Sequence, residues 1–337
     1  MRTLADRVAD TEIEIVSKKH CRAHFPEAVR KCDPLEFDAV KVRNLNTGKV
    51  LGILHYEFPA ENLVNYADKR DESGDHRWTF GSYGNAERSN AAIRSGNVSD
   101  SAWEQYKLAA EKLEAQCEAL LKVGKSTKRR RRWSDEGSEL DIDRVLSLDE
   151  NCWVKTKRDA RARVVKLGIN SAVSCGNDES TFAKLAGLAA GLATVLTRLG
   201  YGVEVWDVCA LNEGGVYRTA QEHLRGCKDD KWIIGATLMK ASDEPVDPAR
   251  IMACSIPGRF RNNTFAVLRG GLGGSSGLGM CFQLPPEAIK YAGLDALIEI
   301  AWTSDAHTQA VNIAGLLSQV QGTEVRCDDD GNFILND

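Results

Sequence analysis

The stretch VVKLGINSAVSCGNDES, residues 164–180, joins an apolar run to a series of small polar residues. A continuous apolar run of this kind is typical of a strand that is buried on both faces of a parallel sheet. The following residues, from about Ser180 to Leu199, are rich in Ala, Gly and Leu and predict a helix that ends at Gly200. In α/β proteins, ligands usually bind at such a junction. Both the fold class and a candidate site therefore follow from this stretch.

Further strands and helices follow toward the C-terminus. The runs 202–211, 231–240 and 294–302 predict three more strands, and Asp-Pro at 247–248 predicts a helix start. Residues 305–320 predict a closing helix. This order predicts a doubly wound, mostly parallel, Rossmann-like α/β sheet, with a right-handed crossover between the first two strands. Gly187 and Gly191 in the first helix predict a close approach to that sheet.

A smaller α+β region precedes this sheet. FDAVKVRNLNTGKVLGILHYEF (37–58) predicts a hairpin, and residues 102–123 have the spacing of an amphipathic helix that ends at Gly124. The chain is therefore divided into a 1–100 α+β region, a 101–160 helix and charged connector, a 161–322 α/β domain and a 323–337 tail.

Composition limits the class of protein. The 337 residues are 43% hydrophobic and carry a formal charge of −4, which is typical of a globular protein and argues against a dedicated nucleic-acid coat protein. The N-terminus has no apolar run, and no stretch has the roughly 18 apolar residues of a membrane span. None of the ten cysteines forms a Cys-x-x-Cys pair, which favours reduced thiols. We therefore expect a cytoplasmic protein.

Three segments carry a resemblance to a known family. RRRRWSDEGSELDIDRVLSLDENCW (129–153), AGLAAGLATVLTRLGYGVEVW (186–206) and EPVDPARIMACSIPGRFRN (244–262) are similar to uncharacterised proteins of bacteriophages and some actinobacteria. That family has a predicted von Willebrand factor A-like domain, and the resemblance covers about residues 76–322. It implies this fold and a phage context, and it brings no known activity.

The resemblance also identifies a degenerate metal site. A domains bind a divalent cation through Asp-x-Ser-x-Ser after the first strand, and the matching positions here are Asn170, Ala172 and Ser174. Asn replaces the carboxylate and Ala removes a hydroxyl, so we expect neither a metal ion nor another cofactor. Ser174, Thr303 and Asp305 remain as the residues that could hold a cation.

We interpret the chain as a non-catalytic, phage-type protein-interaction module whose partner is a phage or host protein. The predicted partner-binding crest comprises residues 170–178, 206–214 and 303–307. Its named residues are Asn170, Ser171, Ser174, Trp206, Asp207, Thr303, Asp305 and His307. Within it, Trp206 would supply an aromatic anchor and Asp207 a charged rim.

Two alternatives stay open. The run KRRRRW (128–133) could contact nucleic acid through Arg129, Arg130, Arg131, Arg132 and Trp133, as in an accessory factor of phage transcription or replication. The acids of 135–143 could instead pair with this run. The second alternative is a metal- or nucleotide-dependent enzyme. Its phosphate loop or lid would be RGGLGGSSGLGM (269–280), which lacks the lysine of a phosphate-binding motif and is interpreted as a surface loop.

A cluster of His and Cys lies near the N-terminus. HCRAHFPEAVRKC (20–32) brings His20, Cys21, His24 and Cys32 together in sequence. The spacing matches no standard zinc site, and we interpret these residues as a solvated helix.

Overall fold

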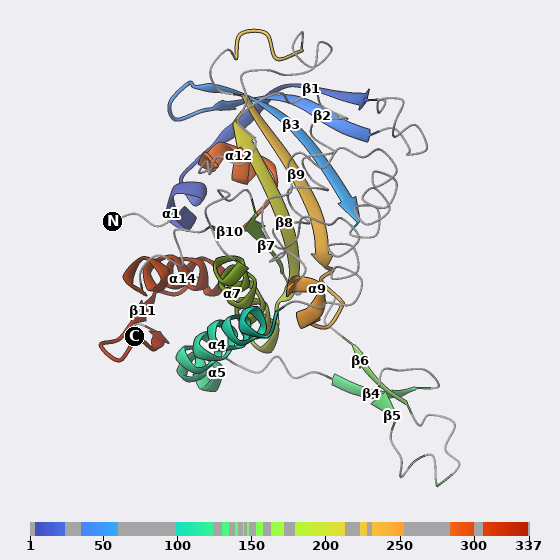
Figure 1. Ribbon diagram of the computed structural model, residues 1–337, viewed down its shortest axis with the longest axis vertical. Coiled ribbons are helices and arrows are strands. Elements are labelled where there is room, and N and C mark those ends of the chain that lie inside the picture. Colours follow the sequence, from blue (N-terminus) through green and yellow to red (C-terminus); the bar gives the residue numbers. More distant parts are fainter. Residues whose placement is uncertain are drawn as a thin grey trace.

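The computed structural model describes a main sheet with helices on both of its faces (Figure 1). The described residues are 4–23, 35–59, 99–123, 130–134, 139–140, 144, 147, 153–157, 163–171, 179–212, 223–227, 231–252, 284–299 and 306–335.

Seven strands form the main sheet, in the order β1-β2-β3-β9-β8-β7-β10. They are β1 (Ile13–Ala23), β2 (Leu35–Asn44), β3 (Val50–Pro59), β7 (Val164–Asn170), β8 (Gly202–Asn212), β9 (Lys231–Lys240) and β10 (Ala296–Ile298). β7 is parallel to β8 and β10, and β3 is parallel to β9. The pairs β1–β2, β2–β3 and β8–β9 are antiparallel. The α/β class is confirmed, although antiparallel pairs are as frequent as parallel ones among the described strands of the main sheet.

The N-terminal hairpin belongs to this same sheet. β3 pairs with β9 from Gly52–Lys231 to Pro59–Leu238, so the strands expected in a separate region extend the C-terminal sheet. The reason lies in the burial of β3: Ile53 and Leu54 point to opposite faces, and both are fully buried. A strand that is apolar on both faces needs cover on both sides, which a free hairpin lacks.

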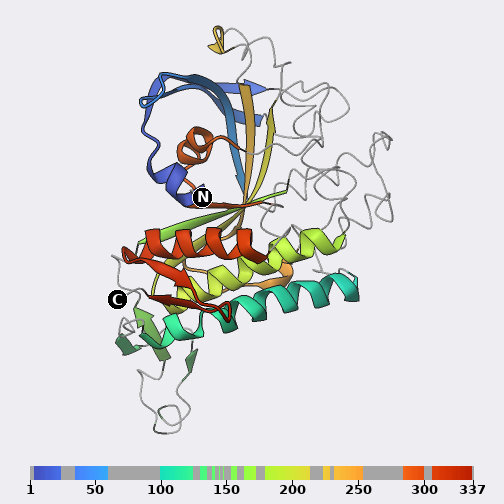
Figure 2. The same ribbon diagram turned by 90° about the vertical axis from the view of Figure 1, so that its left-hand side faces the viewer.

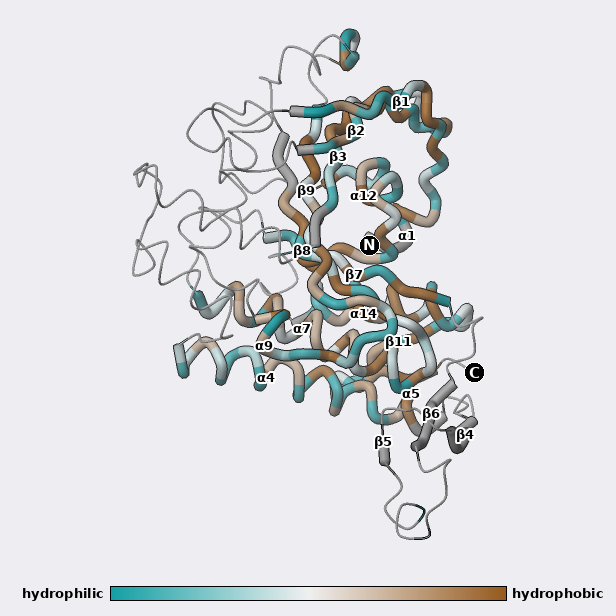
Figure 3. Tube along the Cα trace, turned by 90° about the vertical axis from the view of Figure 1, so that its right-hand side faces the viewer, coloured by the Kyte–Doolittle hydropathy of each residue, from teal (hydrophilic) through white to brown (hydrophobic). Residues whose placement is uncertain are grey.

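Helices cover both faces. On one face lie α7 (Glu179–Arg198), α9 (Pro248–Met252) and α14 (Ala306–Gln321), and α4 (Asp100–Gln116) packs against α7. The other face packs against α1 (Leu4–Ala9) and α12 (Pro286–Tyr291). Figure 2 shows α14, α7 and α4 stacked beneath the sheet, while β1, β2 and β3 curl around α12. In Figure 3, hydrophobic segments follow the strands of the main sheet and α7, whereas α4 has many hydrophilic positions.

The glycines of α7 face α4 rather than the sheet. A Cβ on Gly187 would collide with the carbonyl of Tyr106, and one on Gly191 would lie 3.1 Å from the carbonyl oxygen of Ala110. The close approach expected from the small residues is thus made by a second helix, because the sheet-facing side of α7 carries larger residues such as Leu185 and Leu192.

One helix in the described part of the chain, α7, is long and apolar enough to cross a membrane by length and composition. Of its most apolar window, 72% is buried inside the structure. The sequence alone predicts no segment apolar enough to span a membrane. α7, the central helix of the core, corrects this expectation.

Smaller elements complete the fold. β4 (Arg130–Ser134), β6 (Trp153–Lys157) and β5 (Glu139–Leu140) form a three-stranded sheet. The segment expected as a tail forms a hairpin of β11 (Val325–Cys327) and β12 (Phe333–Leu335) after α14. It lies against α5 (Glu118–Val123), and Phe333 is fully buried in the core of α4, α7 and α14.

Candidate functional site

The predicted crest begins where β7 ends. Of its eight named residues, the structure describes Asn170, Ser171, Trp206, Asp207 and His307. The other three, Ser174, Thr303 and Asp305, lie outside the described residues. The candidate cation site assigned to those three residues is therefore not described either.

Asn170 and Ser171 connect the end of β7 to its two neighbouring strands by hydrogen bonds. The Asn170 amide donates to the carboxylate of Glu299, just past β10, over 3.4 Å, and both residues are buried. The backbone N–H of Ser171 donates to the carbonyl of Val208 in β8 over 2.9 Å. Burial raises the pKa of Glu299, and the hydrogen bond from Asn170 acts in the opposite direction. Sequence reasoning missed Glu299, although a carboxylate within the apolar run LDALIEIAW was a signal.

Trp206 and Asp207 lie inside β8 rather than at its end. Trp206 is level with Gly168 of β7, and its indole N–H donates to Glu204 while Lys166 lies over the ring at 5.6 Å. Asp207 is only 5% exposed. β8 continues to Asn212, so neither residue reaches the edge where an anchor and a charged rim were expected. His307, in the first turn of α14, is the exposed crest residue in the described part.

The basic run lies in β4. Arg130, Arg131, Arg132 and Trp133 belong to this strand, whereas Arg129 lies outside the described residues. The strand pairs with β6 so that Arg130 is opposite Lys157 and Arg132 is opposite Lys155. Directly paired positions share a face of a sheet, so four basic positions share one face here. The glycine-rich segment 269–280 lies outside the described residues.

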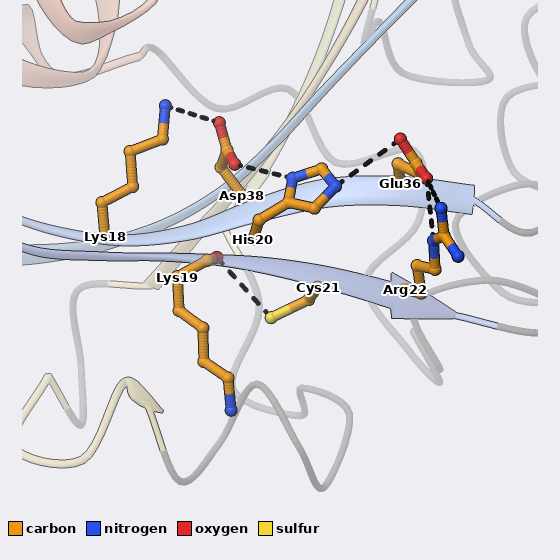
Figure 4. A network of polar contacts seen from close by, with 7 residues as sticks. All are labelled: Lys18, Lys19, His20, Cys21, Arg22, Glu36 and Asp38. Atoms are coloured by element: carbon orange, nitrogen blue, oxygen red, sulfur yellow. Dashed lines mark hydrogen bonds and ion pairs between the residues drawn. The ribbon is translucent and has the colours of Figure 1, made fainter.

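A second group of polar residues crosses the N-terminal hairpin. His20, Asp38 and His55 occupy one row across β1, β2 and β3, since His20 pairs with Asp38 and Asp38 pairs with His55. The Asp38 carboxylate contacts Lys18 Nζ at 2.8 Å and His20 Nδ1 at 3.2 Å (Figure 4). The sequence predicted the hairpin but not its alignment with the strand that carries His20.

The next row is formed by Arg22 and Glu36. Arg22 donates to Glu36 from Nη2 at 2.6 Å and from Nε at 2.8 Å, and His20 Nε2 lies 3.5 Å from the same carboxylate. Lys19 and Cys21 point to the opposite face of the strand (Figure 4). Residues 20–23, the described part of the segment 20–32 that was expected as a solvated helix, belong instead to strand β1, in which side chains alternate between two faces.

This alternation also separates His20 from Cys21, so these two cannot share a zinc ion. His24 and Cys32 lie outside the described residues. Within the part of the chain that the structure covers, no group of three His, Cys, Asp or Glu side chains is arranged to hold a metal ion.

The polar rows border a pocket of about 430 Å³, which we call the hairpin pocket. Its other wall is the C-terminal end of α12 with the two residues after it, residues 291–293, and the strand segments at Phe37 and Tyr56 also border it. The His55 ring meets Tyr291 edge-on, with ring centroids 5.5 Å apart, and His55 Nε2 lies 3.5 Å from Glu57 Oε1.

Specific contacts hold α12 at this position. Glu287 accepts a 2.5 Å hydrogen bond from Asn44 in the hairpin, and Lys290 donates to the carbonyl of Thr11. Gly293, with φ +69°, ends the helix by adopting the left-handed conformation that glycine tolerates. Tyr291 is thereby fixed in the last turn, beside the pocket.

Burial and ion pairing set the protonation states in the pocket. Burial opposes ionisation of Asp38, but hydrogen bonds from Lys18 and His20 lower its pKa overall. The hydrogen bond to Asp38 raises the pKa of Lys18. Burial lowers the pKa of His55 and raises that of Tyr291. These shifts favour an ionised Asp38 beside Lys18, a neutral His55 imidazole and a protonated Tyr291 phenol near neutral pH.

Comparison with known proteins shows one family to which the chain is similar. One family model, described as "Domain of unknown function (DUF7192)", matches residues 68–316. No curated protein and no solved structure matches the chain.

Proposed function

The chain belongs to the DUF7192 family, and from that premise we propose that it is a non-catalytic protein-interaction module with a von Willebrand factor A-like, doubly wound domain. It would be encoded by a phage or related element and act in the host cytoplasm. Its partner would be a phage or host protein that docks on the edge of the sheet where β7, β8 and β10 end.

The order of strands supports this domain type. The chain passes from β7 through α7 to β8 on one side of β7, whereas β10 lies on the other side, and both neighbours are parallel to β7. The direction of winding therefore changes at β7, and binding sites of open α/β sheets lie at such a change. Helices on both faces of the sheet fit the same architecture.

The observation that carries the proposal is the hydrogen bond between Asn170 and Glu299 at that position. Two carboxylates there would repel each other and would favour a cation between them. With Asn at position 170, the amide N–H donates to the Glu299 carboxylate in place of a cation, so this contact between the strand ends needs no ion. A rigid edge of this kind suits docking of another protein better than metal-dependent chemistry.

A photo-crosslinking side chain at position 307 tests the docking edge. His307 is exposed at the start of α14, and Arg198, half exposed at the far end of α7, is a matched control position. In host cells during infection, we expect a discrete crosslinked product from position 307 that is absent from position 198. The same products from both positions, or none from position 307, would exclude this edge as the docking site.

The nucleic-acid alternative is favoured by a separate observation. β6 places Lys155 and Lys157 opposite Arg132 and Arg130, so the paired basic positions extend beyond the run KRRRRW. A small sheet with basic positions of this kind is suited to phosphate contacts.

A further inference from the structure

Among the described residues that line the hairpin pocket, one carboxylate has no Lys or Arg partner. Of its carboxylates, Asp38 is paired with Lys18, and Glu36 is paired with Arg22 through two short contacts. The contact that the structure gives for Glu57 is with His55 at 3.5 Å. The His55 side chain is 11% exposed, and an imidazole that is buried to this degree is disfavoured as a cation.

Glu57 is nevertheless accessible, because its side chain is 53% exposed at the mouth of the pocket. Within the part of the chain that the structure describes, no Lys or Arg pairs with Glu57. A carboxylate in this situation attracts a positively charged group, and charge-assisted hydrogen bonds are among the stronger ones in proteins. The position of Glu57 therefore favours cationic ligands. Its carboxylate would repel an anion, whereas a cation would pair with it and neutralise its charge.

An aromatic ring near Glu57 defines the rest of the ligand. Tyr291 lines the pocket beside the His55 ring, whereas Phe37 and Tyr56 alternate with Asp38, His55 and Glu57 along their strands, so their side chains belong to the other face of the sheet. Aromatic faces bind organic cations better than hydrated metal ions, because the cation contacts the ring directly. A volume of about 430 Å³ lies within the usual range for a small-molecule site.

We propose that the hairpin pocket binds a small organic amine, with its ammonium group on Glu57 and its hydrocarbon body against Tyr291. This site lies on β1, β2, β3 and α12 and is separate from the docking edge at the end of β7. Either proposal can therefore fail without the other.

The test uses the full-length protein and calorimetric titration near neutral pH. The probe is phenethylamine, and the matched probes are phenethyl alcohol, which is neutral, and phenylacetate, which is anionic. We expect saturable binding of the amine and none of the other two. Equal binding of amine and alcohol, or no saturable binding of the amine at millimolar concentration, would overturn the proposal.

Variants locate the bound ammonium group. Glu57→Gln keeps the shape and removes the charge, and we expect at least about a tenfold loss of affinity, as for a hydrogen bond to a charged group. Tyr291→Phe should retain binding, whereas Tyr291→Leu should weaken it severalfold. Glu14→Gln is the matched control, because Glu14 is similarly exposed on β1 but pairs with Arg43. An undiminished affinity in Glu57→Gln would contradict the assignment.

The pH dependence gives an independent readout. His55 faces Glu57, Asp38, Lys18 and Tyr291, and its pKa is below 6.5 through burial. Below that pKa, the protonated imidazole would compete with the amine for Glu57, so affinity should fall as the pH falls. His55→Gln should remove this competition and make the fall in affinity smaller. An unchanged profile in His55→Gln would show that the amine does not contact Glu57 beside His55.

Discussion

Asn170 and Glu299 join the ends of two parallel strands through a buried hydrogen bond of 3.4 Å between amide and carboxylate. The contact lies where the winding of the sheet changes direction, so a substitution there affects both the stability of the edge and its affinity for cations. Measuring stability and cation affinity in variants of these two residues therefore distinguishes the proposed docking edge from the alternative of a metal site.

Asn170→Asp should destabilise the protein at neutral pH. It places two carboxylates in a buried position, and we expect a loss on the order of 3 kcal/mol in the free energy of unfolding, measured in urea. The double variant Asn170→Asp with Glu299→Gln restores an amide–carboxylate pair and should recover most of the loss. In the wild type, millimolar Mg²⁺, Mn²⁺ or Ca²⁺ should leave the melting temperature unchanged. A melting shift in the wild type that chelator reverses would contradict the proposed absence of an ion.

The raised pKa of Glu299 predicts a pH dependence of stability. Burial raises this pKa above the unfolded value near 4.5, so the folded state binds more protons over the interval between the two values. The contribution of Glu299 is fully present below the unfolded pKa and is lost as the pH rises through the raised one. Glu299→Gln should flatten this decline relative to the wild type in urea unfolding across mildly acidic pH. A decline of the same size in Glu299→Gln would assign the effect to other groups.

Close contact between α4 and α7 predicts an unusual effect of alanine. In Gly187→Ala the new Cβ would lie 2.9 Å from the Cβ of Ala109 and against the Tyr106 carbonyl, so we expect a loss of about 1–3 kcal/mol from overpacking. This loss opposes the gain of about 1 kcal/mol that alanine gives inside a helix. Gly191→Ala has its nearest contact at 3.1 Å and should lose less. Thermal unfolding of both variants gives the comparison; a more stable Gly187→Ala would show that α4 does not pack there.

The α/β class followed from sequence because β7, α7 and β8 are local, strongly patterned elements. The role of the hairpin did not follow, since its pairing with β9 joins Gly52 to Lys231, and no local pattern encodes such a distant register. The hairpin pocket was missed for the same reason: His20, Asp38 and His55 form a row only after three strands are aligned. Trp206 and Asp207 were placed too near the strand end because the hydrogen-bonded strand continues to Asn212.

Residues 161–322 should not fold as an isolated unit. Removing β3 uncovers β9, whose Ile233 and Ile234 are fully buried on opposite faces, and removing α4 uncovers the glycines of α7. We expect the 161–322 fragment to aggregate or to unfold without cooperativity, and a 99–337 fragment, which keeps α4 but lacks β3, to be intermediate. Near-UV circular dichroism and urea unfolding measure both. Cooperative unfolding of 161–322 would support the domain boundaries expected from sequence.

The cysteines should be free thiols that differ widely in reactivity. Among the described cysteines, Cys117, Cys209 and Cys227 are buried, and Cys327 is exposed. Burial raises the pKa of Cys117 to about 12, which leaves almost no thiolate to react near neutral pH. Among the described cysteines, alkylation of the native protein should modify Cys327 well before Cys117 and Cys209, because burial raises the pKa of both buried thiols. Alkylation after denaturation without reductant should modify all ten. Two or more thiols protected after denaturation would indicate disulfides and contradict the cytoplasmic assignment.

The basic positions of β4 and β6 give the last prediction. If the primary proposal holds, single- or double-stranded DNA should bind only weakly at low salt and not at physiological salt, because four basic positions neutralise few phosphates. Replacing Arg130 and Arg132 with Ser should then remove about two units from the slope of log affinity against log salt, as expected for two lost phosphate contacts. A matched control replaces Lys107 and Arg198, which lie on α4 and α7 away from this sheet. Suppose instead that tight binding persists at physiological salt and is lost only in the Arg130/Arg132 variant. This result would favour the nucleic-acid alternative over the docking edge, since phosphate contacts would then dominate the affinity for DNA.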